Sequence, residues 1–225
     1  TSWSEPAYWQ MGLFADDWSA HWIGSAEMES QSVGGRPVDN KMFDPWFRKT
    51  FTLTESLKEA LIYVASIGYH ELYVNGCKIG NAVLAPSVTD HKSRARYVTY
   101  DISHYLKKGE NVIALWLGTS WAVFPAYQRN DKPAIPMALA QAEITLTSGS
   151  KVRVITDGSW KTHASPNVLM GYWDAHHFAG EFYDASLEIN GWNEAGFDDS
   201  EWAEAKVYQP QIMVSADKAE SNLLM

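Results

Sequence analysis

The chain has 225 residues, of which 46% are hydrophobic and 20% are charged, a balance typical of a globular protein. Its net charge of −9 argues against nucleic acid or an anionic membrane as partner, because both are bound by basic patches. A single cysteine, Cys77, excludes an intrachain disulfide. No apolar run approaches the length that crosses a membrane, so we expect no membrane-spanning segment.

The first strand is predicted at residues 2–14, where the local sequence contains no partner for it. Residues 16–24 place two tryptophans four positions apart, and a polar, glycine-rich loop is expected at 26–40. Alternating residues at 47–53 then begin the main run of strands. The further predicted strands are 60–67, 69–75, 77–84, 96–100, 111–117, 137–147, 151–156, 160–164 and 205–208.

Turn signals separate these strands. Asn75-Gly76 is the dipeptide that a type I′ hairpin needs, because both of its central residues require φ > 0. Ser148-Gly149-Ser150 predicts a second hairpin turn, and Asp101-Ile102-Ser103 begins a short helix or turn. No long helical period is present. Many short strands with turns between them predict an all-β, antiparallel jelly-roll β-sandwich.

Eleven tryptophans and eleven tyrosines suit either a β-sandwich core or a sugar-binding surface, and we expect most of them in the core. Four loops combine aromatic with polar residues, at 39–46, 86–91, 120–127 and 171–177. Because binding residues gather on loops of a rigid scaffold, these loops predict a sugar-binding surface. Its candidate sugar-binding residues are Asp39, Asn40, Trp46, Asp90, Trp121, Tyr127 and Trp173.

Carboxylate and amide oxygens of these loops, at Asp39, Asn40 and Asp90, also suit a Ca²⁺ site. His176-His177 resembles a metal pair, but neighbouring residues on a strand point to opposite faces, and no third ligand is indicated. Asp198-Asp199 can be interpreted as an acid–base pair for glycosidic chemistry. The alternative, which we favour, is a turn that docks Phe197 and Trp202 onto the sandwich.

A series of short motifs in fixed order resembles the N-terminal β-sandwich region of bacterial α-L-rhamnosidases, glycoside hydrolase family 78. The motifs are Trp18-Ser19-Ala20-His21-Trp22-Ile23-Gly24, Phe47-Arg48-Lys49-Thr50-Phe51, the hairpin at 67–80, Val83-Leu84-Ala85-Pro86 with Thr89-Asp90, residues 97–101, Gly109-Glu110-Asn111, Leu117-Gly118 with Trp121, Gly180-Glu181-Phe182-Tyr183-Asp184-Ala185, and Gly191-Trp192 with 196–202. The resemblance covers residues 18 to about 208.

The resemblance implies a galactose-binding-like accessory sandwich at 16–208. Residues 1–15 would end an upstream fibronectin-III-like β-domain, and residues 209–225 would link to a catalytic domain. It implies an inverting enzyme that removes terminal α-L-rhamnose from glycosides or polysaccharides. Its catalytic carboxylates would lie on an (α/α)₆ barrel outside this chain, so no catalytic residue is assigned here. The expected partners are a rhamnose-containing glycan and that barrel, with export to the periplasm or medium favoured over the cytoplasm.

Some members of the family are similar to a Ca²⁺-dependent rhamnose-binding module, which makes Asp39 and Asn40 the first candidates for contacting ion and sugar. The chain departs from the family pattern at Ser87-Val88, at His91 and around Trp121. Two other functions stay open: a stand-alone carbohydrate-binding module, and the sugar-binding sandwich of a β-galactosidase-like glycosidase, which shares the Phe-Asp-Asp-Ser-x-Trp ending.

Overall fold

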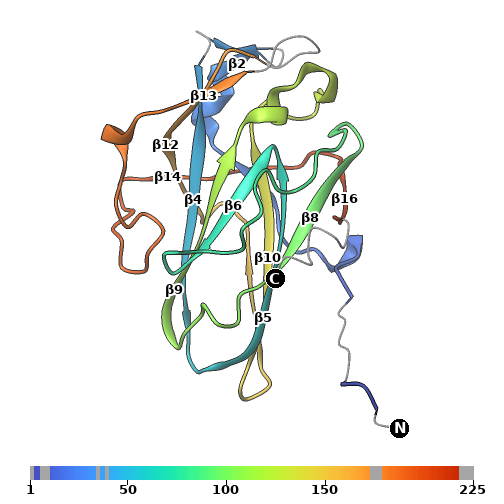
Figure 1. Ribbon diagram of the computed structural model, residues 1–225, viewed down its shortest axis with the longest axis vertical. Helices are drawn as coiled ribbons and strands as arrows, with labels where there is room; N and C mark the ends of the chain where they lie inside the picture. Colours follow the sequence, from blue (N-terminus) through green and yellow to red (C-terminus); the bar gives the residue numbers. More distant parts are fainter. Residues whose placement is uncertain (1–2, 6–10, 34–35, 39–40, 173–178, 218–225) are drawn as a thin grey trace.

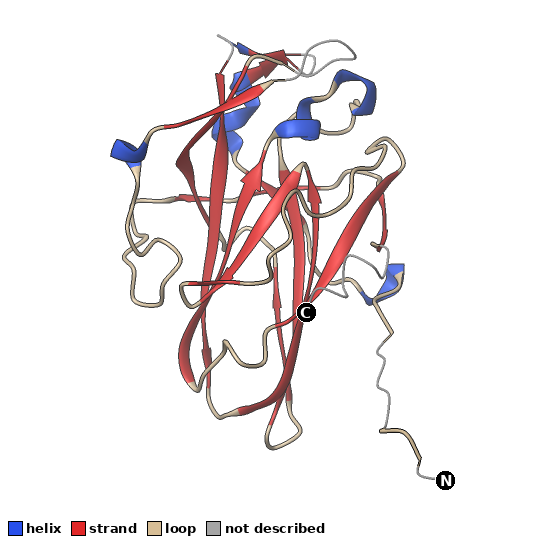
Figure 2. Ribbon diagram, viewed as in Figure 1, coloured by secondary structure: helices blue, strands red, loops and turns tan. Residues whose placement is uncertain are grey.

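The computed structural model describes residues 3–5, 11–33, 36–38, 41–172 and 179–217. Over these residues the chain forms two seven-stranded sheets that pack face to face as a β-sandwich (Figure 1). The helices of this part of the chain are short 3-10 turns in the connections between strands (Figure 2). None of them is long and apolar enough to cross a membrane. The predicted all-β sandwich is confirmed.

The two sheets have simple strand orders. Sheet I runs β15-β1-β10-β5-β8-β16, with β11 also paired to β10, and sheet II runs β13-β12-β4-β9-β6-β7, with β14 also paired to β12. The strands of sheet I are β1 (Trp22–Gly24), β5 (Leu57–Ile67), β8 (Arg94–Asp101), β10 (Met137–Leu146), β11 (Lys151–Ile155), β15 (Lys206–Tyr208) and β16 (Met213–Ala216). The strands of sheet II are β4 (Lys41–Leu53), β6 (Tyr69–Val74), β7 (Cys77–Lys78), β9 (Gly109–Gly118), β12 (Lys161–Met170), β13 (Gly180–Tyr183) and β14 (Ala203–Glu204).

Short elements occupy the connections. The segment between β1 and β4, predicted as a loop, holds a 3-10 helix and a two-stranded hairpin. The connecting elements are η1 (Ala15–Asp17), η2 (Ala26–Gln31), β2 (Ser32–Val33), β3 (Arg36–Pro37), η4 (Ser120–Val123), η5 (Pro125–Tyr127) and η6 (Ala185–Leu187). In Figure 1, η4 and η5 (yellow-green) lie at the same end of the sandwich as β2 and β13.

The predicted strands occur close to their expected positions, with four differences. The strand expected at 47–53 already begins at Lys41 as β4, so residues 41–46 are not the loop that was predicted. The strand expected at 77–84 is only β7, because Gly80 (φ 75°) and Leu84 (φ 56°) turn the chain out of the extended conformation. The strand expected at 160–164 continues as β12 to Met170. Residues 3–5 and 11–14 of the expected first strand have no regular secondary structure, and its other residues lie outside the described part of the chain.

The two predicted hairpin turns are confirmed. Asn75 (φ 49°) and Gly76 (φ 83°) both have positive φ and join Val74 directly to its partner Cys77. The second hairpin joins β10 to β11, where Leu146 donates its N–H to the Ser150 carbonyl at 2.8 Å and Gly149 has φ 89°. Each turn sets the register of the strands that it connects.

The core is built around β5, which is buried on both faces. Ala60, Ile62 and Val64 pack into the cluster between the sheets. The alternate residues Tyr63, Ala65 and Ile67 belong to a second cluster. This explains why residues 60–67 are a nearly continuous apolar run rather than an alternating one.

The outer face of sheet II carries a tryptophan cluster. Trp46 is 1% exposed and stacks on Trp192 with ring centroids 4.6 Å apart and planes 12° apart. Trp202 stacks on it at 6.2 Å, and Trp116 meets it edge-on at 5.9 Å. The 3-10 helix η6 and the loop after it bring Trp192 and Trp202 to this face from β13.

The turn interpretation of Asp198-Asp199 agrees with this packing. The Asp198 carboxylate accepts the Ser200 N–H at 3.0 Å, and the Trp202 N–H donates to the Asp199 carbonyl at 3.0 Å. The Asp199 carboxylate pairs with the buried guanidinium of Arg48, which also donates to the Glu194 carbonyl at 3.0 Å. Both carboxylates therefore hold the turn that docks Trp202.

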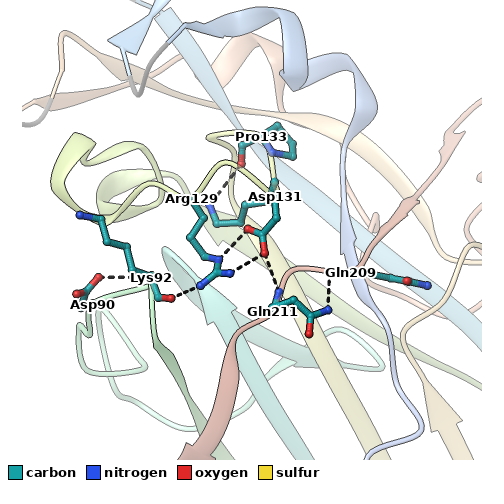
Figure 3. A network of polar contacts seen from close by, with 8 residues as sticks. Asp90, Lys92, Arg129, Asp131, Pro133, Gln209 and Gln211 are labelled. Carbon is teal, nitrogen blue, oxygen red and sulfur yellow. Dashed lines mark hydrogen bonds and ion pairs between the residues drawn. The ribbon is translucent and has the colours of Figure 1, made fainter.

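The segment after residue 208, predicted as a linker, is part of the sandwich as far as Asp217. Its strand β16 pairs with β8, and this pairing is parallel, in contrast to the other strand pairs of the described residues. Asp131 anchors the start of the segment by accepting the Gln211 N–H at 3.0 Å, while its carboxylate holds Arg129 at 2.7 Å (Figure 3).

The end of the segment is anchored by a buried carboxylate. Asp217, 6% exposed, accepts the Ser87 N–H at 2.9 Å and pairs with Arg96 at 3.2 Å. These long-range partners, on the 87 loop and on β8, could not be inferred from the local sequence at 209–217.

Candidate functional site

A cleft of about 230 Å³ opens on the outer face of sheet II, next to the tryptophan cluster. It draws residues from five strands, β4, β6, β9, β12 and β13, and from the loop after β7. The lining residues are Asp44, Tyr69, Glu71, Val83, Leu84, Trp116, Leu117, Gly118, Asn167 and Glu181. Carboxylates, an amide, aromatic rings and aliphatic side chains therefore meet in one small concavity.

Strand alternation on β6 directs two of these side chains outward. Tyr69 and Glu71 are half-buried and line the cleft, while the intervening His70 is buried. His70 bonds Ser66 Oγ at 2.9 Å and the Tyr100 hydroxyl at 3.0 Å. Tyr69 pairs with Gly118 of β9, where an added Cβ would lie 1.8 Å from Tyr69 Cζ. Only glycine at 118 leaves room for the ring.

Asp44 forms the floor of the cleft. One of its carboxylate oxygens accepts the Thr119 N–H at 2.7 Å and the Thr119 hydroxyl at 2.6 Å, and the other accepts Asn167 Nδ2 at 2.6 Å. Asn167 is directed there by an irregularity of β12, whose register with β4 shifts between Ala164 and Val168. The three bonds tie β4 to β12 and to Thr119, the residue that follows β9, beneath the cleft.

Burial raises the pKa of Asp44 to about 7, with the charge of Glu181 acting in the same direction, against the lowering effect of its hydrogen bonds from Thr119 and Asn167. A carboxyl of raised pKa beside another carboxylate is also the arrangement of glycosidic acid–base pairs. Here, however, both oxygens of Asp44 are occupied by protein donors. The arrangement therefore favours a structural floor over an acid catalyst.

The walls of the cleft carry the remaining polar groups. The Tyr69 hydroxyl donates to Glu181, and burial is the main cause that raises the pKa of Tyr69. Glu71 accepts the Tyr73 hydroxyl at 2.6 Å and pairs with Lys78. Trp116, opposite Glu71 in the β6–β9 register, supplies a half-buried aromatic wall. These groups can bind and orient a small polar ligand.

Three of the seven predicted sugar-binding residues, Asp39, Asn40 and Trp173, lie outside the described part of the chain, as do His176 and His177. The structure contradicts the surface role predicted for Trp46, because the residue is buried under the rings of Trp192 and Trp202, which both stack on it. Its burial follows from the long-range docking of the 191–202 loop.

The other three lie in the loops at one end of the sandwich. Asp90 is exposed and its carboxylate accepts the Lys92 N–H at 2.9 Å, so it also shapes a turn. Trp121 and Tyr127 are half-buried in η4 and η5. The rings of His91 and Tyr127 lie 6.0 Å apart, and Arg129 donates to the Lys92 carbonyl (Figure 3). The structure thus brings the Asp90 and Tyr127 loops together.

A metal centre is not apparent in the described part of the chain. Among those residues, no group of three or more His, Cys, Asp and Glu side chains is arranged to hold a metal ion. The predicted ligands Asp39 and Asn40 lie outside it.

Local sequence patterns mark several of the cleft residues. Tyr69, Glu71 and Tyr73 alternate with His70, Leu72 and Val74, which marks a polar, aromatic outer face on β6. Asp44 lies within the segment 39–46 that was predicted to be a loop, yet it belongs to β4. Glu181 lies within one of the family motifs. What could not be inferred was that these residues meet.

The comparisons with known proteins agree with one another. The sequence profile of the α-L-rhamnosidase N-terminal domain family matches residues 55–223. The chain is similar to an α-L-rhamnosidase of Formosa agariphila. The two are 29% identical over an alignment of 232 residues, gaps included, which covers 94% of this chain and 24% of the relative. An α-L-rhamnosidase of Alteromonas sp. (strain LOR) is 31% identical over 207 residues, which cover 90% of this chain and 22% of that protein.

A solved structure has the same fold. The α-L-rhamnosidase from Dictyoglumus thermophilum superimposes with a TM-score of 0.75 at 31% identity, over 91% of this chain and 23% of its own. The chain therefore spans about a quarter of the length of the curated relatives and of the solved structure that it matches.

Proposed function

The chain belongs to the α-L-rhamnosidase N-terminal domain family, and from this premise we propose that it acts as the accessory β-sandwich of a longer α-L-rhamnosidase. One observation supports the proposal most directly. Nearly all of this chain aligns with the α-L-rhamnosidases, but it covers only about a quarter of the length of each of them. The remaining three quarters of such a protein have room for a catalytic domain. Membership of this family also favours the rhamnosidase over the β-galactosidase-like alternative.

The proposed whole protein removes terminal α-L-rhamnose from a glycan with inversion, by carboxylates on an (α/α)₆ barrel outside this chain. An inverting enzyme needs a general acid and a general base far enough apart to admit a water molecule. Within the described residues, Asp44 and Asp199 are occupied by protein partners, which supports an accessory role. Residues 1–15 are proposed to end an upstream β-domain. The sandwich then runs from residue 16 to Asp217, and the residues that follow lead to the barrel.

The test compares this 225-residue chain with the longer protein from which such a domain derives. We expect an aryl α-L-rhamnoside to be hydrolysed by the longer protein and not by this chain at equal molar concentration. Hydrolysis by the isolated chain would overturn the accessory assignment, and an inactive longer protein would overturn the rhamnosidase assignment.

Carbohydrate binding by the loops at the end of the sandwich is the second part of the proposal. The contact between the Asp90 and Tyr127 loops supports it, and Asp39, Asn40, Trp121 and Trp173 complete the proposed sugar-binding set, with Asp39 and Asn40 also proposed to hold Ca²⁺. Calorimetric titration of L-rhamnose with Ca²⁺ and with a chelator tests it. We expect heat of binding with Ca²⁺ that the double variant D39A/N40A lacks, whereas no heat with Ca²⁺ would count against loop binding.

A further inference from the structure

The cleft on the outer face of sheet II combines three kinds of surface in one place. Its rim is aliphatic, with Val83 75% exposed and Leu84 53% exposed. The half-buried ring of Trp116 forms one wall. Carboxylate oxygens of Glu71 and Glu181 and the Tyr69 hydroxyl face the same space. An apolar side and a side rich in hydrogen-bond acceptors suit an amphipathic ligand.

The cleft is also held in a fixed shape. The aliphatic rim is anchored to β6, because His70 donates its N–H to the Ala85 carbonyl at 2.8 Å. Trp116 packs against its cross-strand partner Trp46 in a T-shaped contact, with ring centroids 5.9 Å apart. Below, Asp44 of β4 bonds Asn167 of β12 and Thr119, which follows β9. A ligand therefore meets groups that are already positioned, which lowers the entropy cost of binding.

A sugar ring matches these walls. One face of a pyranose presents C–H groups, which pack on an aromatic or aliphatic surface, and its edge presents hydroxyl donors. Hydroxyls that donate to carboxylates make charge-assisted hydrogen bonds, which are stronger than neutral ones. We propose that this cleft binds one neutral sugar unit, with its apolar face on Trp116 and Leu84 and its hydroxyls donating to the Glu181 carboxylate and to the Tyr69 hydroxyl oxygen.

The charge of the cleft limits the ligand further. The Glu181 carboxylate repels an anionic sugar, so a uronate is expected to bind more weakly than the matching neutral sugar. A cationic ligand would find few free partners. Glu71 already pairs with Lys78, and Asp44 has its oxygens filled by Thr119 and Asn167. The neutral sugar is therefore favoured over a cation.

The residues that line this cleft differ from the proposed loop residues Asp90 and Tyr127, and none of them is proposed to hold a metal ion. The site deepens the proposed function, on which it rests for the choice of L-rhamnose as the first probe. Because loop binding is proposed to need Ca²⁺, a chelator separates the two sites.

The test is saturation-transfer NMR on this chain in EDTA, with L-rhamnose first and then the pair D-galactose and D-galacturonate. E181Q removes the charge of one wall, and Y69F removes only its hydroxyl. The matched control is E204Q, because Glu204 is an exposed glutamate of the same sheet that lies outside the cleft. The unfolding midpoint of each variant shows that it folds.

We expect saturation transfer to L-rhamnose, with affinity about tenfold lower in E181Q and Y69F and unchanged in E204Q. We also expect D-galacturonate to bind more weakly than D-galactose. Arginine methyl ester serves as the cationic probe. The proposal is overturned by any of three results: no neutral sugar bound in EDTA, equal binding by E181Q and the wild type, or stronger binding of arginine methyl ester than of the neutral sugars. Hydrolysis by the longer protein without sugar binding here would overturn only this inference. Sugar binding here without hydrolysis by the longer protein would overturn only the rhamnosidase assignment.

Discussion

At the scale of single residues, the structure assigns roles that the residue types alone leave open. Trp46 and Trp116 lie opposite each other on neighbouring strands, yet one is buried by the 191–202 loop and the other lines a cleft. Asp44 and Asp199 are both carboxylates in aromatic surroundings. The first joins β4 to β12 and to the end of β9, and the second holds a buried arginine.

Asp44 gives a prediction about proton binding. Because its pKa is raised to about 7, the folded protein binds this proton more tightly than the unfolded chain does. Its contribution to stability is therefore present at low pH and is lost as pH rises from about 4 through 7, by at most ~1.4 kcal/mol per pH unit. We expect a ¹³C-carboxyl NMR titration of Asp44 with a midpoint near 7.

The variant D44N removes this titration. The difference in free energy of unfolding between wild type and D44N should therefore fall as pH rises from about 4 to 7. A carboxyl signal that titrates near 4, with a pH-independent difference, would contradict the burial of Asp44 as the cause.

At the scale of elements, turns and edges decide how the strands join. The β6–β7 hairpin follows from Asn75-Gly76, whereas β16 joins sheet I through partners far away in the sequence. A local signal sets the first element, and tertiary contacts set the second.

The positive φ at Gly76 allows a prediction of how an added methyl group there would change the stability of the protein. G76A should destabilise the protein by about 1–2 kcal/mol, because Gly76 has φ 83° and an alanine there is strained. The added Cβ would also lie 3.1 Å from Glu194 Cγ, a flexible group that can move. G158A is the control, since its Cβ would meet neighbours at ordinary distances of 3.8 Å and more. Equal urea midpoints for the two variants would contradict the turn assignment.

The anchoring of β16 by Asp217 allows a prediction about how often this strand detaches from β8. D217N removes the charge that binds Arg96 and the Ser87 N–H, so β16 should detach more often. A loss of ~1.5–3 kcal/mol for hydrogen bonds to a charged group corresponds to amide exchange at 213–216 that is faster by roughly tenfold or more. Hydrogen-exchange mass spectrometry measures it. S215A, within the same strand, should exchange like the wild type, and unchanged exchange in D217N would show that Asp217 does not hold β16.

At the scale of the whole molecule, two buried histidines set the response to acid. Burial lowers the pKa of His70 to about 3. It is also the largest cause that lowers the pKa of His91 to about 4. The unfolded chain therefore binds protons at these two histidines near pH 6.5, whereas the folded protein does not. The stability that these residues contribute is present above about 6.5 and is lost as pH falls toward 4.

Asp44 acts in the opposite direction over much of the same range, but two histidines outweigh one carboxyl. We expect the free energy of unfolding, measured by urea denaturation, to be lower at pH 5 than at pH 7. The ring NMR signals of His70 and His91 should stay unchanged between pH 8 and 5. A histidine that titrates near 6.5 in the folded protein would contradict the burial argument for that residue.

The sequence by itself determined the all-β class, both hairpin turns, most strand positions and the family resemblance. These depend on alternation, on residues that allow positive φ, and on short motifs, all of which act over a few neighbouring positions. Even the Asp198-Asp199 turn followed from local chemistry.

The tertiary structure alone decided that Trp46 is buried, that the chain to Asp217 completes sheet I, and that Asp44, Tyr69, Trp116, Asn167 and Glu181 share one cleft. Residues 44 and 181 lie far apart in the chain, and five strands must pair in register before their side chains meet. Strand pairing between distant segments depends on the packing of the complete sandwich, which no local pattern encodes.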